Sequence, residues 1–129
     1  MGRKQVVSFG FDGTLCLEDG SPNKVMMDLV RKYAAEGYKC YVVTSRTRTQ
    51  ESKRWIAEHE PDRIRVKDFI KEHDLPIKQC HFTNGFDKGQ VLYQVQSIRH
   101  YDHQPEQLKC AREHGIEGIL SSDVDHTTS

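Results

Sequence analysis

Short hydrophobic runs alternate along the chain with longer segments in which hydrophobic residues recur every three or four positions. The short runs predict buried strands over residues 6–11, 40–43, 80–83, 97–101 and 116–120. The longer segments predict helices. The first has Ser21 as its N-cap and Pro22 at its first helical position, and it ends at Gly37. Strands that alternate with helices are typical of a parallel sheet with crossover helices.

The other predicted helices lie between the later strands. They cover residues 47–58, about 63–73, 88–95, and the segment from Pro105 to Gly115. We therefore expect one α/β domain over residues 1–120, with about five parallel strands, the first strand central and helices on both faces. Residues 121–129 are polar and without periodicity, which predicts a frayed C-terminal tail.

Composition narrows the class of protein. The hydrophobic share of 36% in 129 residues is enough for one core and argues against disorder. Lys plus Arg equals Asp plus Glu at 19 each, so any basic surface must be local. The apolar N-terminal run is too short for a signal peptide or a membrane span, and the four cysteines form no Cys-x-x-Cys pair. We expect a cytoplasmic protein with reduced thiols and no membrane partner.

Four short motifs lie where predicted strands end or a helix begins. They are Gly10-Phe11-Asp12-Gly13-Thr14-Leu15, Val42-Val43-Thr44-Ser45-Arg46, Asn84-Gly85-Phe86-Asp87-Lys88-Gly89 and Arg99-His100-Tyr101-Asp102-His103. In this order they resemble the motifs of the haloacid dehalogenase (HAD) superfamily of phosphatases, over residues 6 to about 120. Ligands of open α/β sheets bind beyond the carboxyl ends of the strands, where these motifs would converge. The resemblance implies a Rossmann-like, HAD-like core.

The resemblance also implies a magnesium-dependent phosphomonoesterase that forms an aspartyl-phosphate. Position 10 is that of the nucleophile, and Asp12 is the general acid and base. Thr44, preferred to Ser45, and Lys88 would bind the phosphoryl oxygens. Asp102 and the backbone carbonyl of Asp12 would bind Mg²⁺. Gly13, Thr14, Ser45 and Arg46 are expected to complete the substrate site.

The sequence departs from this pattern at two positions. Gly10 has no side chain, so it can neither attack phosphorus nor contribute the carboxylate that the family uses as a metal ligand. His103 stands where many members have a second acidic residue. We expect an inactive or severely impaired enzyme with reduced Mg²⁺ affinity.

Each candidate residue also has a structural interpretation. Gly10 could serve an unusual backbone geometry, Asp12 could cap a turn, Thr44 could simply end a strand, Lys88 could be a solvated helix-start lysine, and Asp102 could be an N-cap. His100 and His103 are interpreted as structural, because no third ligand has zinc spacing. Arg46, Arg48, Lys53 and Arg54 form either a solvated helix face or, through Arg46, a second phosphate site.

Two segments that hold cap domains in the HAD superfamily, 15–22 and 47–78, are too short for one here. The resemblance therefore implies a cap-less member, whose open crevice goes with large substrates such as nucleic acid ends, or with oligomers that cover each other's sites. A nucleotide or polynucleotide phosphate end is the expected substrate. The alternative is a non-catalytic HAD-like module that binds a phosphorylated partner or scaffolds an assembly. A receiver domain is excluded, because its phosphorylated Asp would end the third strand, where Thr83-Asn84 stand.

Overall fold

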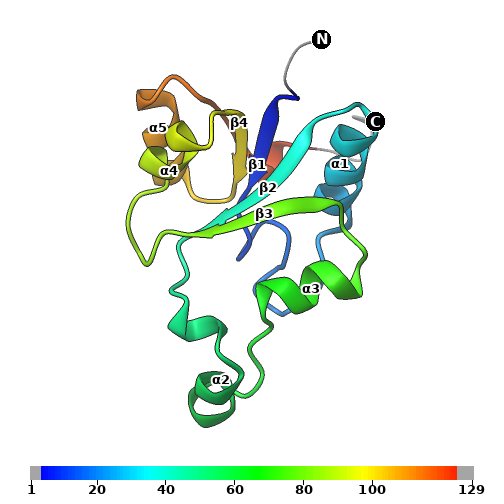
Figure 1. Cartoon of the computed structure of the whole chain (residues 1–129), viewed down its shortest axis with the longest axis vertical. Coiled ribbons are helices and arrows are strands. Elements are labelled where there is room, and N and C mark those ends of the chain that lie inside the picture. Colours follow the sequence, from blue (N-terminus) through cyan, green and yellow to red (C-terminus); the bar gives the residue numbers. More distant parts are fainter. Residues whose placement is uncertain (1–3, 125–129) are drawn as a thin grey trace.

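A five-stranded sheet, in which every strand is parallel to its neighbours, forms the centre of the molecule (Figure 1). The computed structural model describes residues 4–124. The strands are β1 (Val6–Phe9), β2 (Lys39–Thr44), β3 (Ile77–Phe82), β4 (Ser97–Asp102) and β5 (Glu117–Leu120). Their order is β3-β2-β1-β4-β5, so the first strand is central, as predicted. The single Rossmann-like α/β domain is confirmed.

Helices cover both faces of the sheet (Figure 1). The helices are α1 (Lys24–Ala35), α2 (Lys53–His59), α3 (Val66–Glu72), α4 (Gly89–Gln94) and α5 (Pro105–Glu113), of which α2 projects away from the sheet. Neighbouring residues of a strand point to opposite faces. Val42 accordingly packs in the larger core cluster with residues of α1 and α3, whereas Val43 packs with Leu92 of α4 and Ala111 of α5.

The first strand and the first helix are both shorter than predicted. The chain leaves the sheet after Phe9, because the carbonyl of Phe11 accepts hydrogen bonds from the backbone N–H groups of residues 14, 15 and 16 and closes a turn. The predicted helix cap at Ser21 and start at Pro22 are wrong. Pro22 forms an isolated bridge with Cys16, and the side chain of Asn23 caps α1 instead. Asn and Ser are both favoured at the N-cap, so the local sequence does not distinguish position 23 from position 21.

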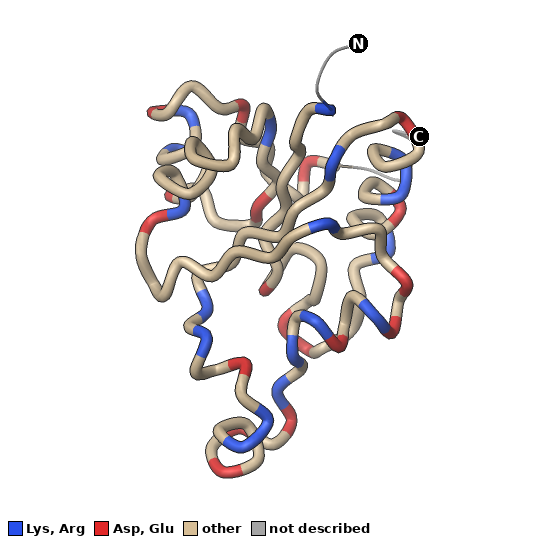
Figure 2. The backbone as a smooth tube through the Cα atoms, in the orientation of Figure 1, with Lys and Arg blue, Asp and Glu red and all other residues tan. Residues whose placement is uncertain are grey.

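The crossover between β2 and β3 is more broken than predicted and carries many charged residues (Figure 2). The helix expected over 47–58 is divided into a 3₁₀ turn, η1 (Thr49–Glu51), and α2, because Ser52 is extended and caps α2 with its side chain. The helix expected over 63–73 begins only at Val66, because Arg65 is extended. At these breaks, Glu51 and the carbonyl of Ile64 both contact Arg46, which follows β2.

Later elements match the expectations within one or two residues, with two exceptions. β3 begins at Ile77 rather than at residue 80, because an edge strand with exposed polar side chains lacks a hydrophobic run. Residues 121–123, expected in the tail, form a 3₁₀ turn, η2 (Ser121–Asp123), in which Ser121 is buried. The rest of the expected tail, 125–129, lies outside the described residues. No helix of residues 4–124 is long and apolar enough to cross a membrane.

Candidate active site at the carboxyl edge of the sheet

Three of the four motifs converge because the strands are parallel. Phe9 of β1 is level with Val42 of β2 and with Tyr101 of β4. The residues that follow, Gly10, Thr44 and Asp102, therefore meet at one edge of the sheet. Lys88, which directly precedes α4, reaches the same edge through its side chain. The parallel topology thus brings Gly10, Thr44, Lys88 and Asp102 to one edge of the sheet, as expected.

The backbone at Gly10 does not need a glycine. Its φ lies outside the left-handed region, where Gly13, Gly20, Gly37, Gly85 and Gly115 are found. A Cβ at position 10 would lie 2.9 Å from Oδ2 of Asp102 and 3.1 Å from Oγ1 of Thr14. That hydroxyl is buried and has no hydrogen-bond partner within the described chain. Position 10 is therefore surrounded by polar groups, one of which lacks a partner.

Asp102 is fully buried and fully hydrogen-bonded. Its Oδ2 accepts from Nζ of Lys88 at 2.6 Å and from Nε2 of His100 at 2.9 Å. Its Oδ1 accepts from the backbone N–H groups of His103 at 2.8 Å and Gln104 at 3.3 Å. Burial alone would raise the pKa of Asp102, but the hydrogen bond from His100 and the charge of Lys88 outweigh it and hold that pKa well below its usual range. The carboxylate is thus ionised and paired.

A buried polar chain extends from Asp102 into the sheet. Nδ1 of His100 lies 2.8 Å from Oγ of Ser8, which lies 2.7 Å from Oγ of Ser97. Burial lowers the pKa of His100 despite the neighbouring carboxylate, so the imidazole is neutral and donates from Nε2. Ser8 and Ser97 are polar residues inside predicted buried strands, a pattern that indicates a buried hydrogen-bonded network.

Arg46 binds Asp12, the residue of the first motif that is expected to act as general acid and base. Its Nε and Nη2 donate to the two carboxylate oxygens of Asp12, each at 2.8 Å. Burial would raise the pKa of Asp12, but these hydrogen bonds and the charge of Arg46 outweigh it and lower the pKa. Lys88 lowers it further. The carboxylate of Asp12 is ionised in this arrangement, and its acid–base role stays a prediction.

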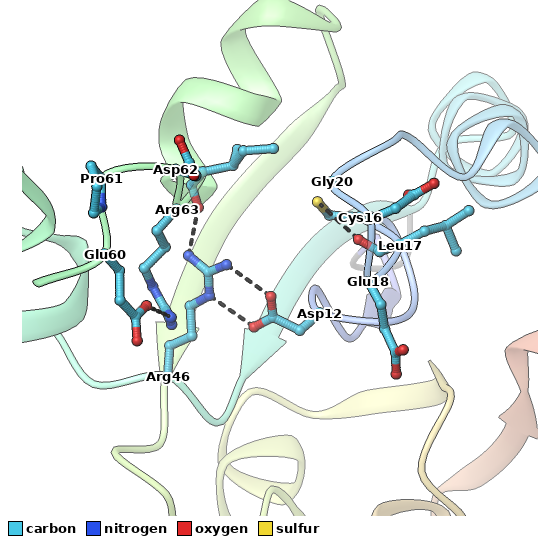
Figure 3. A pocket seen from close by; sticks show the side chains of 12 residues that line it. Asp12, Cys16, Leu17, Glu18, Gly20, Arg46, Glu60, Pro61, Asp62 and Arg63 are labelled. Carbon is cyan, nitrogen blue, oxygen red and sulfur yellow. Dashed lines mark hydrogen bonds and ion pairs between the residues drawn. The ribbon is translucent and has the colours of Figure 1, made fainter.

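Arg46 also ties the crossover to the sheet. Its Nη1 donates to Glu51 at 2.6 Å and to the carbonyl of Ile64 at 2.7 Å, and its guanidinium lies 4.8 Å from the ring centre of Phe11. Figure 3 shows Arg46 between Asp12 and the segment around Arg63, in a cavity of about 480 Å³. Four of the five guanidinium N–H groups are engaged, so a phosphate that leaves these partners in place could bind Arg46 only through the second N–H of Nη2.

The remaining site residues occupy the same edge. Oγ1 of the buried Thr44 accepts from the backbone N–H of Arg46 at 3.3 Å, and the Ser45 carbonyl accepts from Gly85. Gly13 has a φ of +76°, and a Cβ there would lie 2.6 Å from the ring of His103. The glycine is required at this position by both its backbone and its neighbour. The phosphate-binding roles of Thr44, Ser45, Gly13 and Thr14 stay predictions.

The residues present do not fit a magnesium ion. Among residues 4–124, no three His, Cys, Asp or Glu side chains are grouped as metal ligands would be. Both oxygens of Asp102 are already occupied by hydrogen-bond donors, the carboxylate of Asp12 is bound by Arg46, and Gly10 contributes nothing. Mg²⁺ needs several oxygen ligands in near-octahedral geometry. No catalytic step is therefore assigned to a metal in this chain.

No protein-family model and no curated protein matches the chain. It is similar to a solved structure described as the Pnkp1/Rnl/Hen1 RNA repair complex, with a TM-score of 0.65 and 17% identity. The match covers 91% of this chain and 42% of that one, so the chain spans less than half the length of its structural neighbour. At this identity the similarity supports the α/β fold and leaves function to the residues of the site.

Proposed function

We propose that this protein has a HAD-type site for phosphate monoesters. The site binds a phosphoryl group but does not hydrolyse the ester, because residue 10 is glycine. The motifs around Gly10, Thr44, Lys88 and Asp102 lie at one edge of the sheet, where α/β folds bind ligands. The phosphoryl group would be bound by the hydroxyl of Thr44 and the ammonium of Lys88. In HAD phosphatases an aspartate at the position that matches Gly10 attacks phosphorus and forms an aspartyl-phosphate.

The buried hydroxyl of Thr14 is the observation that carries this proposal. A buried hydroxyl without a partner costs about 1–3 kcal/mol, so native structures seldom retain one. This one lies 3.1 Å from where a side chain at position 10 would begin. An acceptor side chain at position 10, such as a carboxylate, would lie within its reach. The unpaired hydroxyl and the ordinary backbone at Gly10 together support a missing nucleophile.

A nucleotide or polynucleotide phosphate end is the substrate that we propose. The segments 15–22 and 47–78 form no separate domain over the site. A site without a cap domain suits a phosphate that belongs to a large molecule. The structural neighbour is an RNA repair complex by its description, which agrees with this substrate class at the level of the fold only.

The deciding experiment compares the chain with Gly10→Asp. Hydrolysis of an aryl phosphate and of 5′- and 3′-phosphorylated oligonucleotides is measured with and without Mg²⁺. We expect turnover only by Gly10→Asp with Mg²⁺, and the preferred phosphate then identifies the substrate class. Equal turnover by the unaltered chain would show that another group attacks phosphorus and would refute the mechanism.

A non-catalytic role is the second candidate, and one observation favours it. Asp102, which forms a buried ion pair with Lys88 at 2.6 Å, has both of its oxygens occupied by hydrogen-bond donors, so neither is free for the metal that hydrolysis would use. If neither protein turns over but both bind a phosphorylated oligonucleotide more tightly than its unphosphorylated form, the chain is a phosphate-binding module. This second role also predicts that Thr44→Val weakens binding of the phosphorylated form alone.

A further inference from the structure

A second cavity, of about 480 Å³, lies along the edge strand β3 and against α3. Four cations line it: Arg48 before η1, Lys67 and Lys71 on α3, and Lys78 on β3. Figure 2 shows the Lys and Arg positions of these elements in blue. No Asp or Glu is among the lining residues. We call this surface, defined by Arg48, Lys67, Lys71 and Lys78, the β3 groove.

The four cations of the β3 groove are all exposed, and none forms an ion pair within residues 4–124. Some other cations of the helices are paired, whereas these four unpaired cations gather in one cavity. Lys24 pairs with Asp28, Arg54 with Glu58, and Arg65 with Asp68, each three or four residues apart. In a chain with equal numbers of acidic and basic residues, such a set leaves a local positive surface. The charge is available to a ligand.

The cavity at Asp12 and Arg46 has the opposite character. Five carboxylates line it, from Asp12, Glu18, Asp19, Glu60 and Asp62, against the guanidinium groups of Arg46 and Arg63. Both guanidinium groups already bind carboxylates, at Asp12 and Glu60. A polyanion would be repelled there and attracted to the β3 groove.

One end of the β3 groove lies beside Thr44 of the candidate site. Phe82, which lines its end, is level with Thr44 in the sheet, and the next residue, Thr83, donates its backbone N–H to the carbonyl of Thr44 at 2.8 Å. The guanidinium of Arg48 lies 5.5 Å from the ring centre of Phe82. Proteins that bind single-stranded nucleic acid combine basic side chains of this kind with aromatic rings.

We propose that the β3 groove binds the sugar–phosphate backbone of a single-stranded polynucleotide whose end lies at the carboxyl edge of the sheet. The backbone runs along β3, with its phosphates beside Lys78, Lys71, Lys67 and Arg48. The placement of the end rests on the proposed function, whereas the binding of the strand does not. The sequence indicated a basic cluster between residues 46 and 54. In the fold, only Arg48 of that cluster lines the β3 groove, together with three lysines that are distant in the sequence.

The test measures fluorescence anisotropy of a labelled oligodeoxythymidylate of about 12 nucleotides, with and without a terminal phosphate. Four contacts predict a slope of log K against log salt of about −2.8, since each single-strand phosphate contact contributes about −0.7. In Lys71→Gln/Lys78→Gln, the slope should fall by about 1.4 and affinity by roughly 25-fold at about 0.1 M salt. The matched control, Lys32→Gln/Lys109→Gln, removes two exposed helix lysines elsewhere.

The outcomes separate the groove from the site. If the control lowers affinity as much as the groove variant, or if a polyglutamate peptide binds as tightly as the oligonucleotide, the β3 groove is not a nucleic-acid surface. If the groove variant loses affinity but the terminal phosphate contributes nothing, the groove stands and the proposed function fails. We expect unchanged melting temperatures for both variants, because all four lysines are exposed. That result excludes unfolding as the cause of a loss of affinity.

Discussion

At the scale of single residues, Gly10 is unusual because its backbone is ordinary and its neighbours are polar, although a side chain there would require the carboxylate of Asp102 to shift. Its backbone is ordinary, yet Oγ1 of Thr14 and Oδ2 of Asp102 both approach the place of a Cβ. Gly13 is the contrasting case, since its positive φ and the ring of His103 both require glycine. The backbone and its neighbour thus require glycine at position 13, whereas the backbone at position 10 does not.

Gly10→Asp should create a dependence of stability on Mg²⁺. The new carboxylate would crowd that of Asp102, and Lys88 alone cannot neutralise two negative charges. We expect the variant to be less stable than the unaltered chain by about 1–3 kcal/mol without Mg²⁺ and to regain stability when the ion binds. Melting temperatures with EDTA and with Mg²⁺ test this.

The neutral variant Gly10→Asn is the control, because it has the same size but adds no charge. Its melting temperature should not respond to Mg²⁺. A response of the unaltered chain as large as that of Gly10→Asp would contradict the conclusion that Asp102 offers no free ligand atom.

At the scale of elements, the crossover from β2 to β3 is anchored by polar contacts more than by its own hydrophobic residues. Ile56 is the one buried residue of α2. Arg46 instead connects the turn after β1, η1 and the segment before α3 through Asp12, Glu51 and the carbonyl of Ile64. Glu51 extends this network by accepting from the backbone N–H of Val66 at 2.6 Å.

Arg46→Met should therefore destabilise the fold by about 3–5 kcal/mol, because Glu51 would remain largely buried without its counterion. The exposed pair of Arg54 with Glu58 supplies the control. Arg54→Met should cost less than about 1 kcal/mol. Urea denaturation measures both, and hydrogen exchange should become faster over residues 47–65 in Arg46→Met alone. Equal losses in the two variants would mean that Arg46 is not the anchor.

At the scale of the whole molecule, the two faces of the sheet are stabilised differently. The face covered by α1 and α3 has a large apolar cluster, which includes Val7, Phe9 and Phe69. Within the described residues, the face toward α4 and α5 has a small apolar cluster around Val43 and Leu92. The side chains of Ser8 and His100 are buried in the polar chain that extends from β1 and β4 to Lys88.

That polar chain predicts a pH dependence of global stability. The pKa of His100 is lowered in the folded state, so the unfolded chain binds a proton near pH 6.5 where the folded chain does not. The free energy of unfolding should thus fall as the pH decreases below about 6.5, by up to about 1.4 kcal/mol per pH unit. Asp102 changes the pH dependence only at lower pH. The stability that comes from its lowered pKa is present at neutral pH and is lost as the pH falls below about 3.9.

Denaturation between about pH 5 and 7 tests this, and slopes are compared rather than absolute stabilities. His100→Gln should show a flatter dependence than the unaltered chain. His59→Gln, which alters an exposed histidine of α2, should leave the slope unchanged. Parallel curves for the unaltered chain and His100→Gln would show that the buried imidazole does not bind its proton differently in the two states.

The sequence by itself determined the strand–helix alternation, the central first strand and the edge at which Gly10, Thr44, Lys88 and Asp102 meet, because hydrophobic periodicity and parallel topology are local and general. It could not place the start of α1 at Asn23 or the edge strand at Ile77, because competing caps and polar edge positions look alike in one dimension. Only the tertiary structure decided that Asp102 pairs with Lys88 and His100, that Arg46 clamps Asp12, and that Arg48 joins Lys67, Lys71 and Lys78. Side-chain hydrogen bonds and surface charge depend on distances between segments far apart in the chain, and packing alone fixes those distances.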